Sequence, residues 1–260
     1  MKKLIYLLMI VFMGVACTKD SVNESASLDG SSGGKGGSMA RFAISGDMLY
    51  TVSSTSLQLF NIENAADPRH YPARDVQVGF DIETIFPMDT LLFIGSRNGM
   101  FVYDIAVPRF PVLLSQVNHF RSCDPVVAQG NYAFVTLNTN SFTCGITPNN
   151  VLDIYDISDL SSPMLKKTLS LSGPTGLGVD GDKLFICDKG LKVFDISDPL
   201  SLRQIDDLAE IDEVDVREAY DVIPLSGLLI LVAREGLFQF DYTGDRLKYI
   251  SKITIKQEKP

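Results

Sequence analysis

Three acidic residues, Glu83, Asp124 and Asp221, have the type and spacing that could perform chemistry together. Each stands at or beside the start of the first strand of a repeated unit, so the fold would gather them at one end of the molecule. Glycoside hydrolysis requires two carboxylates flanking one bond, and clustered carboxylates raise one another's proton affinity or bind a cation. The alternative interpretation is that each is a separately hydrated turn residue.

Histidine and cysteine chemistry has little support. The chain has two histidines, and we expect His70 in a turn and His119 near the end of an outer strand. Neither is placed as the base that a serine triad needs. The four cysteines form no C-x-x-C pair, which argues against a structural zinc site.

Two glycine-rich runs are interpreted as structural. Residues 173–178 lead into a predicted strand and not a helix, and residues 33–38 have neither the strand nor the helix of a phosphate-binding loop. Residues 180–182, Asp-Gly-Asp, resemble the opening of a calcium loop but lack the later glutamate, so we expect a hairpin turn. We predict no cofactor and no metal.

Composition indicates a folded, acidic protein. Hydrophobic residues make up 45% and charged residues 21% of the 260 residues, an ordinary balance for a globular chain. A formal charge of −9 argues against a nucleic-acid partner, which requires a basic face.

The first segment is typical of a secretory leader. Lys2 and Lys3 precede an apolar run over residues 4–16 that is too short to span a bilayer as a helix. A buried core helix is the alternative, but polar residues at helical spacing are missing. Residues 14–17, Gly-Val-Ala-Cys, resemble a bacterial lipobox, which implies a signal peptide over 1–16 and lipidation of Cys17. Residues 17–38 are then a serine- and glycine-rich tether outside the cytoplasm.

The remainder, residues 39–260, repeats one unit five times. Related four-residue segments carry an asparagine or aspartate at their third position, and these residues lie 43, 52, 39 and 46 residues apart: Asn61, Asp104, Asp156, Asp195 and Asp241. Each unit reads as four short strands separated by turn residues, and no stretch has a helical period. We predict an all-β, five-bladed β-propeller of four-stranded antiparallel blades, with the fifth blade closing against the first. Two β-sandwiches are the alternative.

The repeated acidic residues are predicted to be turn formers. An aspartate after the third strand can bond the backbone two residues on, and proline soon follows in several units. In the fourth unit the predicted strands cover residues 175–179, 183–187, 191–196 and 203–208.

An insertion of about ten residues falls between Leu137 and Val151, in the third unit. It contains Cys144, and Cys123 starts the first strand of the same unit, so both map to one face of the blade. We expect a Cys123–Cys144 disulfide, which in the chain-entropy model is worth roughly 3 kcal/mol; two buried thiols are the alternative. Cys187 is expected to be a small core residue.

Residues 154–159 (Ile-Tyr-Asp-Ile-Ser-Asp) and 193–199 (Val-Phe-Asp-Ile-Ser-Asp-Pro) resemble the LVIVD repeat. Residues 33–42 resemble the entry to that domain in Bacteroidota lipoproteins, while residues 241–244 depart from the usual turn. The resemblance covers nearly all of the chain after the tether. It implies a propeller at the cell surface or in the periplasm, and it assigns no activity.

Two hypotheses of function follow. The preferred one is a non-enzymatic binding or scaffold propeller that a lipid anchors to the outer membrane. Its ligand would be a protein or a glycan at the channel mouth, the end of the central channel where the first strands begin, because a ring of loops presents a surface there. The other is a glycan-acting hydrolase that uses Glu83, Asp124 and Asp221. The absence of tryptophan from the chain disfavours the hydrolase, since sugars stack on aromatic platforms.

Overall fold

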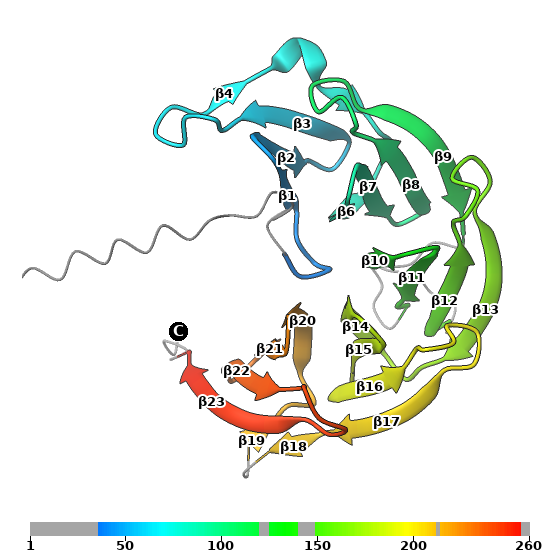
Figure 1. Cartoon of the computed structure of the whole chain (residues 1–260), viewed down its shortest axis with the longest axis vertical. Helices are drawn as coiled ribbons and strands as arrows, with labels where there is room; N and C mark the ends of the chain where they lie inside the picture. Colours follow the sequence, from blue (N-terminus) through cyan, green and yellow to red (C-terminus); the bar gives the residue numbers. More distant parts are fainter. Residues whose placement is uncertain (1–35, 120–124, 140–148, 212–213, 256–260) are drawn as a thin grey trace, which may run out of the picture.

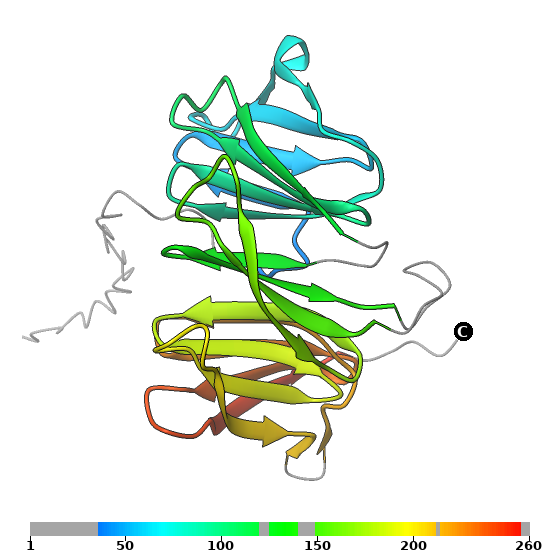
Figure 2. The same ribbon diagram turned by 90° about the vertical axis from the view of Figure 1, so that its right-hand side faces the viewer.

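The computed structural model describes residues 36–119, 125–139, 149–211 and 214–255. Five antiparallel sheets surround a common axis, each running from its first strand at the centre to its last at the periphery (Figure 1). The predicted all-β, five-bladed propeller is confirmed. Figure 2 shows the sheets from the side, one stacked face to face on the next.

The blades are meanders of successive hairpins. In blade 1 the outer strand is interrupted. Two short strands take its place, both pair with β3, and they flank a 3-10 helix at Pro72–Arg74. Its strands are β1 (Phe42–Ser45), β2 (Met48–Val52), β3 (Ser56–Asn61), β4 (Arg69–His70) and β5 (Val76–Gln77). Blade 2 has β6 (Ile82–Met88), β7 (Leu91–Ser96), β8 (Gly99–Asp104) and β9 (Val112–Asn118). Blade 3 has β10 (Val126–Gln129), β11 (Tyr132–Leu137), β12 (Val151–Asp156) and β13 (Met164–Ser170).

Blades 4 and 5 complete the chain. Blade 4 has β14 (Pro174–Asp180), β15 (Lys183–Asp188), β16 (Leu191–Asp195) and β17 (Arg203–Leu208), within about a residue of the predicted strands. A small hairpin, β18 (Glu210–Ile211) and β19 (Val214–Asp215), leads to blade 5. Blade 5 has β20 (Ala219–Leu225), β21 (Leu228–Ala233), β22 (Gly236–Asp241) and β23 (Lys248–Thr254).

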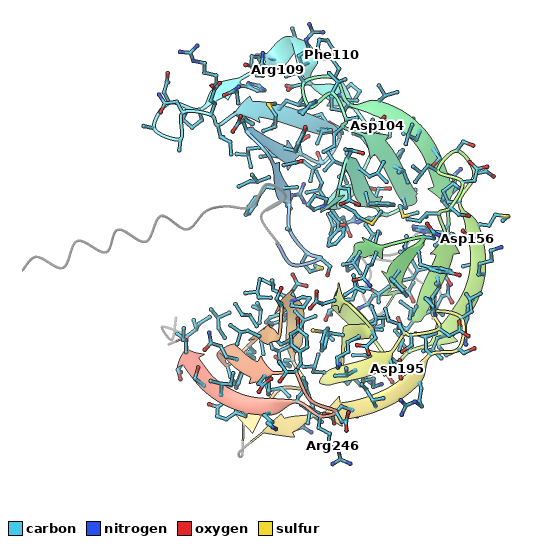
Figure 3. The ribbon with its side chains drawn as sticks, in the orientation of Figure 1. Asp104, Arg109, Phe110, Asp156, Asp195 and Arg246 are labelled. Atoms are coloured by element: carbon cyan, nitrogen blue, oxygen red, sulfur yellow. The ribbon has the colours of Figure 1, made fainter. Side chains whose placement is uncertain are left out.

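The acidic turns have the predicted local structure. Asp195 Oδ1 accepts hydrogen bonds from the backbone N–H and the hydroxyl of Ser197 at 3.0 and 2.6 Å, and Asp156 does the same with Ser158. Asp104 accepts from the N–H of Ala106 at 2.7 Å. Figure 3 labels these three aspartates, which occupy the same place in blades 2, 3 and 4. They stabilise the turn between the third and fourth strands.

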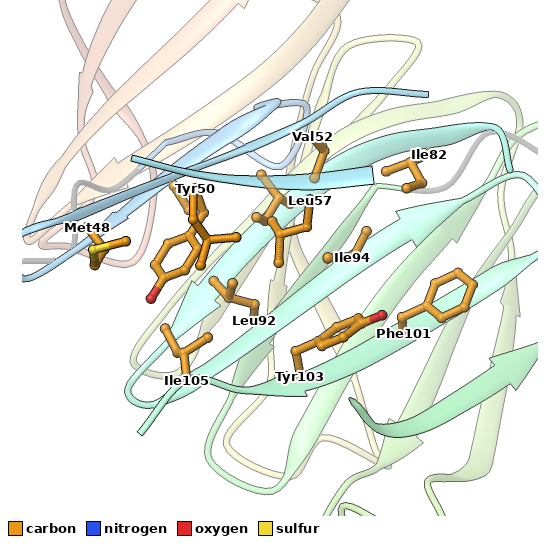
Figure 4. Close-up of a cluster of buried hydrophobic side chains, with 13 residues drawn as sticks. Met48, Tyr50, Val52, Leu57, Ile82, Leu92, Ile94, Phe101, Tyr103 and Ile105 are labelled. Atoms are coloured by element: carbon orange, nitrogen blue, oxygen red, sulfur yellow. The ribbon is translucent and has the colours of Figure 1, made fainter. Parts of the chain in front are cut away.

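The hydrophobic core is divided among the interfaces between successive blades. Four clusters of buried side chains join blade 1 to 2, 2 to 3, 3 to 4 and 4 to 5. Figure 4 shows the first, in which Tyr50 and Leu57 of blade 1 pack against Ile94 and Tyr103 of blade 2. Each sheet therefore buries a face against the next sheet.

The expected closure of blade 5 on blade 1 is not seen. Among the described residues no core cluster joins these two blades, which form the two ends of the arc in Figure 1. One physical reason is polarity: Thr51 and Gln58 occupy the free face of blade 1, and Gln239 that of blade 5. In blade 4 the position equivalent to Gln239 is Val193, which packs in the cluster shared with blade 5.

The two histidines lie at or next to the outer strands of blades 1 and 2. His70 lies in the two-residue strand β4 and stacks on Phe60, with ring centroids 4.6 Å apart, so its predicted place in a turn is wrong. His119 directly follows β9, as predicted. Within the described part of the chain, no helical segment has the length and apolarity to cross a bilayer.

Candidate functional site

The centre of the ring holds a short segment that precedes the first strand, residues 36–41, called the strap below. Its carbonyl groups accept hydrogen bonds from two blades: Ala40 from the N–H of Ile85 in β6, and Arg41 from the N–H of Val52 in β2. Its other end lies against β14 and β20 (Figure 1). The strap therefore links blades 4 and 5 to blades 1 and 2 across the inner rim.

Asp221 of β20 holds the strap. Its carboxylate accepts the hydroxyl hydrogen of Ser38 at 2.9 Å and the backbone N–H of Met39 at 3.1 Å, and also the N–H of Val222 at 2.9 Å. The Ser38 oxygen in turn accepts the N–H of Leu177 in β14 at 2.8 Å. Ser38 is 1% exposed and Asp221 is 9% exposed, so the hydrogen bonds are shielded from water.

Two glycines make room for this arrangement. A Cβ at Gly37 would lie 1.9 Å from Asp221 Oδ2, and a Cβ at Gly176 would lie 2.2 Å from Asp221 Oδ1. The run at residues 173–178 therefore lets β14 approach β20 closely, which supports its structural interpretation. A β-bulge in each of these strands aims the backbone near the site.

Burial raises the pKa of the Asp221 carboxyl above its usual range, and the hydrogen bonds from Met39, Val222 and Ser38 oppose that rise. A carboxyl group with a raised pKa can serve as an acid in catalysis. Both oxygens of Asp221, however, already accept hydrogen bonds from the protein. The arrangement suits a structural anchor better than a proton donor to a substrate.

The other two predicted acids have separate surroundings. Glu83 lies at a bulge at the start of β6, the place that Tyr220 takes in β20, and it accepts a hydrogen bond from Arg97 Nε at 2.8 Å. This bond raises the pKa of Arg97. Asp124 lies outside the described residues. Within the described ranges, no group of three or more histidine, cysteine or acidic side chains could hold a metal.

Of the four cysteines, only Cys187 lies among the described residues. Cys17, Cys123 and Cys144 lie outside the described residues. Cys187 is 1% exposed in the core between blades 4 and 5, as predicted, and burial raises the pKa of its thiol. A thiol held in its protonated form is a poor nucleophile.

A polar groove of about 460 Å³ lies at the opposite end of the strands, between blades 4 and 5. Arg203 pairs there with Asp195 at 2.7 Å, and Arg246 comes from the facing turn (Figure 3). Its acidic and basic side chains balance one another: Asp182, Asp195 and Asp245 against Lys183, Arg203 and Arg246. Small-molecule sites are mostly apolar, so this groove is the weaker candidate.

Sequence reasoning missed Ser38. It assigned residues 17–38 to the tether, yet Gly37 and Ser38 are buried at the centre of the ring. The glycine-rich composition of residues 33–38 hides the single hydroxyl that bonds Asp221.

The fold is a propeller of repeated blades, and three segments of the chain match a known sequence repeat. The LVIVD repeat matches residues 121–144, 146–170 and 175–205, which fall in blades 3 and 4. Curated proteins give no significant match.

Solved structures share the fold at low sequence identity. A protein from Lactobacillus plantarum is 14% identical with a TM-score of 0.60, over 80% of this chain and 69% of that one. A protein of unknown function from Desulfotomaculum acetoxidans is 9% identical with a TM-score of 0.63, over 83% and 69%. AztD from Citrobacter koseri is 12% identical with a TM-score of 0.56, over 78% and 58%. These likenesses concern the fold alone.

Proposed function

We propose that this chain is a non-enzymatic binding or scaffold propeller of the cell envelope, displayed by a lipid on Cys17 at the outer membrane. Its ligand would be a protein or a glycan at the end of the ring where the first strands begin. The observation that carries this proposal is the engagement of Asp221 by the strap. A carboxylate bound to Ser38 and Met39 is part of the framework and not free to act on a bond.

The competing hypothesis, a glycan-acting hydrolase, relies on Glu83, Asp124 and Asp221. Of these, Glu83 bonds Arg97 and Asp221 bonds the strap. Hydrolysis requires one carboxyl to protonate the leaving group and another to attack or to activate water. Two acids already engaged by protein donors are poorly suited to both tasks.

An oligosaccharide and peptide library separates the two hypotheses. We expect the full chain to retain ligands on an array without releasing shortened products, and Glu83→Gln to leave that binding unchanged within about twofold. An exposed acid at the opposite end of the strands, just after β3, serves as the matched control: Glu63→Gln. Turnover of any oligosaccharide that Glu83→Gln abolishes would establish the hydrolase instead.

The envelope location has its own test. Labelling of growing cells with a radioactive fatty acid should mark the wild-type chain and not Cys17→Ser. Thiol titration of the denatured, unreduced Cys17→Ser chain should find a single free thiol, that of Cys187, if Cys123 and Cys144 are bridged. Equal fatty-acid label on both chains rejects the anchor, and three titratable thiols reject the bridge.

A further inference from the structure

Every interface inside the ring follows one pattern. In blade 4, Phe185 and Cys187 of the second strand and Leu191 and Val193 of the third are at most 2% exposed, because blade 5 covers them. Corresponding positions of blades 1, 2 and 3 contribute to the other three clusters. The face that each of these blades turns toward its successor is thus a buried, mostly apolar surface.

Blade 5 has the same face, and among the described residues no further blade covers it. Leu191 and Leu237 each follow a glycine with positive φ, so the two third strands align, and Ile230 and Val232 take the places of Phe185 and Cys187. The side chains of Ile230, Val232 and Leu237 are only half-buried. Together with their cross-strand neighbours they form the blade 5 end face: Ile223, Leu225, Leu228, Ile230, Val232 and Leu237.

The outer strand of blade 5 also has an apolar side chain that no neighbouring blade covers. Ile253 of β23 stands opposite Leu237, and it is 60% exposed. Its equivalents in blades 2 and 4, Val117 and Leu208, pack against the cluster shared with the next blade. A contiguous exposed apolar patch is typical of an interaction surface.

The margin of this face is polar and electrically balanced. Asp241 and Lys248 are direct cross-strand partners, and Ser251 donates a hydrogen bond to Gln239 at 2.7 Å. An apolar centre with a polar rim is the usual anatomy of a protein interface. Because opposite charges are paired at the rim, two such faces can meet even though the chain carries a formal charge of −9.

The free face of blade 1 is a poorer match for it. Thr51 and Gln58 face each other there at 3.4 Å between their side-chain oxygens, and His70 stacks over Phe60. At the inner rim, the strap already occupies the end of β20 where an inner strand of blade 1 would pack. The aliphatic end face of blade 5 is therefore best complemented by a surface of its own kind.

We propose that the blade 5 end face packs against the same face of a second copy of this chain. The contact extends the series of sheet-on-sheet interfaces already present in the ring by one more. A surface that pairs with itself is isologous and closes as a two-fold dimer, the commonest symmetric assembly. This dimer goes beyond the binding role proposed above and depends neither on the lipid nor on the ligand.

Sedimentation velocity of the purified full chain, in a detergent matched to solvent density, tests the dimer. We expect a concentration-dependent dimer, and Ile230→Asp should weaken it at least about tenfold by placing an unpaired charge in the interface. Val232→Thr, which keeps the shape and adds one hydroxyl, should weaken it less while preserving the melting temperature. The control is Leu165→Asp on β13, since Leu165 is an exposed apolar residue outside the end face, at 51%.

Three results would overturn the proposal. One is a monomer at every concentration up to roughly 100 μM, well above the dissociation constants of specific dimers. Another is a dimer that both end-face variants leave unchanged while they remain folded. The last is a monomer that binds lipid vesicles through these residues, which would assign the face to a membrane surface.

Discussion

Asp221 is a carboxylate at the first strand of the last blade that bonds the segment preceding the first blade. Its partners Ser38 and Met39 are more than 180 residues away in sequence, at separations of 183 and 182. A hydrogen bond over that distance constrains nearly the whole chain. The residue that sequence reasoning placed in a catalytic set is thus better explained as a link between the two ends of the fold.

Replacing this carboxylate should destabilise the protein. Asp221→Ala leaves the buried Ser38 hydroxyl without its acceptor, which costs about 1–3 kcal/mol, and it also removes the acceptor of the part-buried Met39 N–H. We expect urea unfolding to show a loss of that size, together with faster proteolysis at the strap. Glu218→Ala, at an exposed ion pair with Arg234, is the control and should change stability by less than about 0.5 kcal/mol. An unchanged midpoint for Asp221→Ala would remove the anchoring role.

Gly176 provides a steric test of the same place. An alanine Cβ there would lie 2.6 Å from Asp221 Cα and 2.7 Å from the Tyr220 carbonyl oxygen, so β14 and β20 would have to separate. Overpacking of this kind costs about 1–3 kcal/mol, and thermal melting should show it. Gly244→Ala is the matched control because nothing lies within 4 Å of its added Cβ. Equal melting temperatures for both variants would contradict the close packing of the two strands.

At the scale of single elements, the turn after the third strand makes a prediction about acid titration. Hydrogen bonds from the hydroxyl and N–H of Ser197, and then from Arg203, lower the pKa of Asp195 to about 2. A carboxyl whose pKa is lower folded than unfolded, about 3.9, adds stability above pH 4 that is lost as the pH falls toward 2. Carbon-detected NMR should measure this pKa, and Ser197→Ala should raise it. A value near 4 in the wild type would mean that the turn does not form in solution.

The elements themselves were predictable because their signals are local. Strand ends are marked directly in the sequence by turn residues such as Gly181, which has a φ of +58°. They are also marked by aspartates that accept a hydrogen bond from the backbone N–H two residues on. The strap was not predictable, since its two glycines and single serine have the composition of a linker. The position of the strap depends on Asp221 in blade 5. A contact between residues so far apart in the chain produces no periodic pattern in the sequence.

At the scale of the whole molecule, the five repeats led us to predict a closed ring, which the described residues do not show. Repeat counting sees five equivalent units, whereas packing depends on individual end-face residues such as Thr51, Gln58 and Gln239. Polar outer faces are what terminal repeats of an open array need for solubility. The chain combines such polar positions with an aliphatic patch on blade 5, so its two ends differ.

An arc of blades and a closed ring differ in how stability is distributed. In repeat proteins each unit is stabilised mainly by its neighbours, and an end unit has one neighbour where an inner unit has two. Among the described residues, blade 3 shares a core cluster with blades on both sides, while blade 1 shares one with blade 2 alone. Opening of blade 1 should therefore require less free energy than opening of blade 3.

Hydrogen exchange measured by mass spectrometry reads these differences strand by strand. We expect amides of β2 in blade 1 to exchange at least about tenfold faster than those of β11 in blade 3, because losing one interface is worth more than about 1.4 kcal/mol in local opening. In the Ile230→Asp variant, β21 of blade 5 should exchange as fast as β2, since that variant removes the partner copy. β7 and β15, which lie in inner blades, are internal controls and should match β11. Equal protection of β2, β11 and β21 in that variant would mean that blades 1 and 5 cover each other in solution.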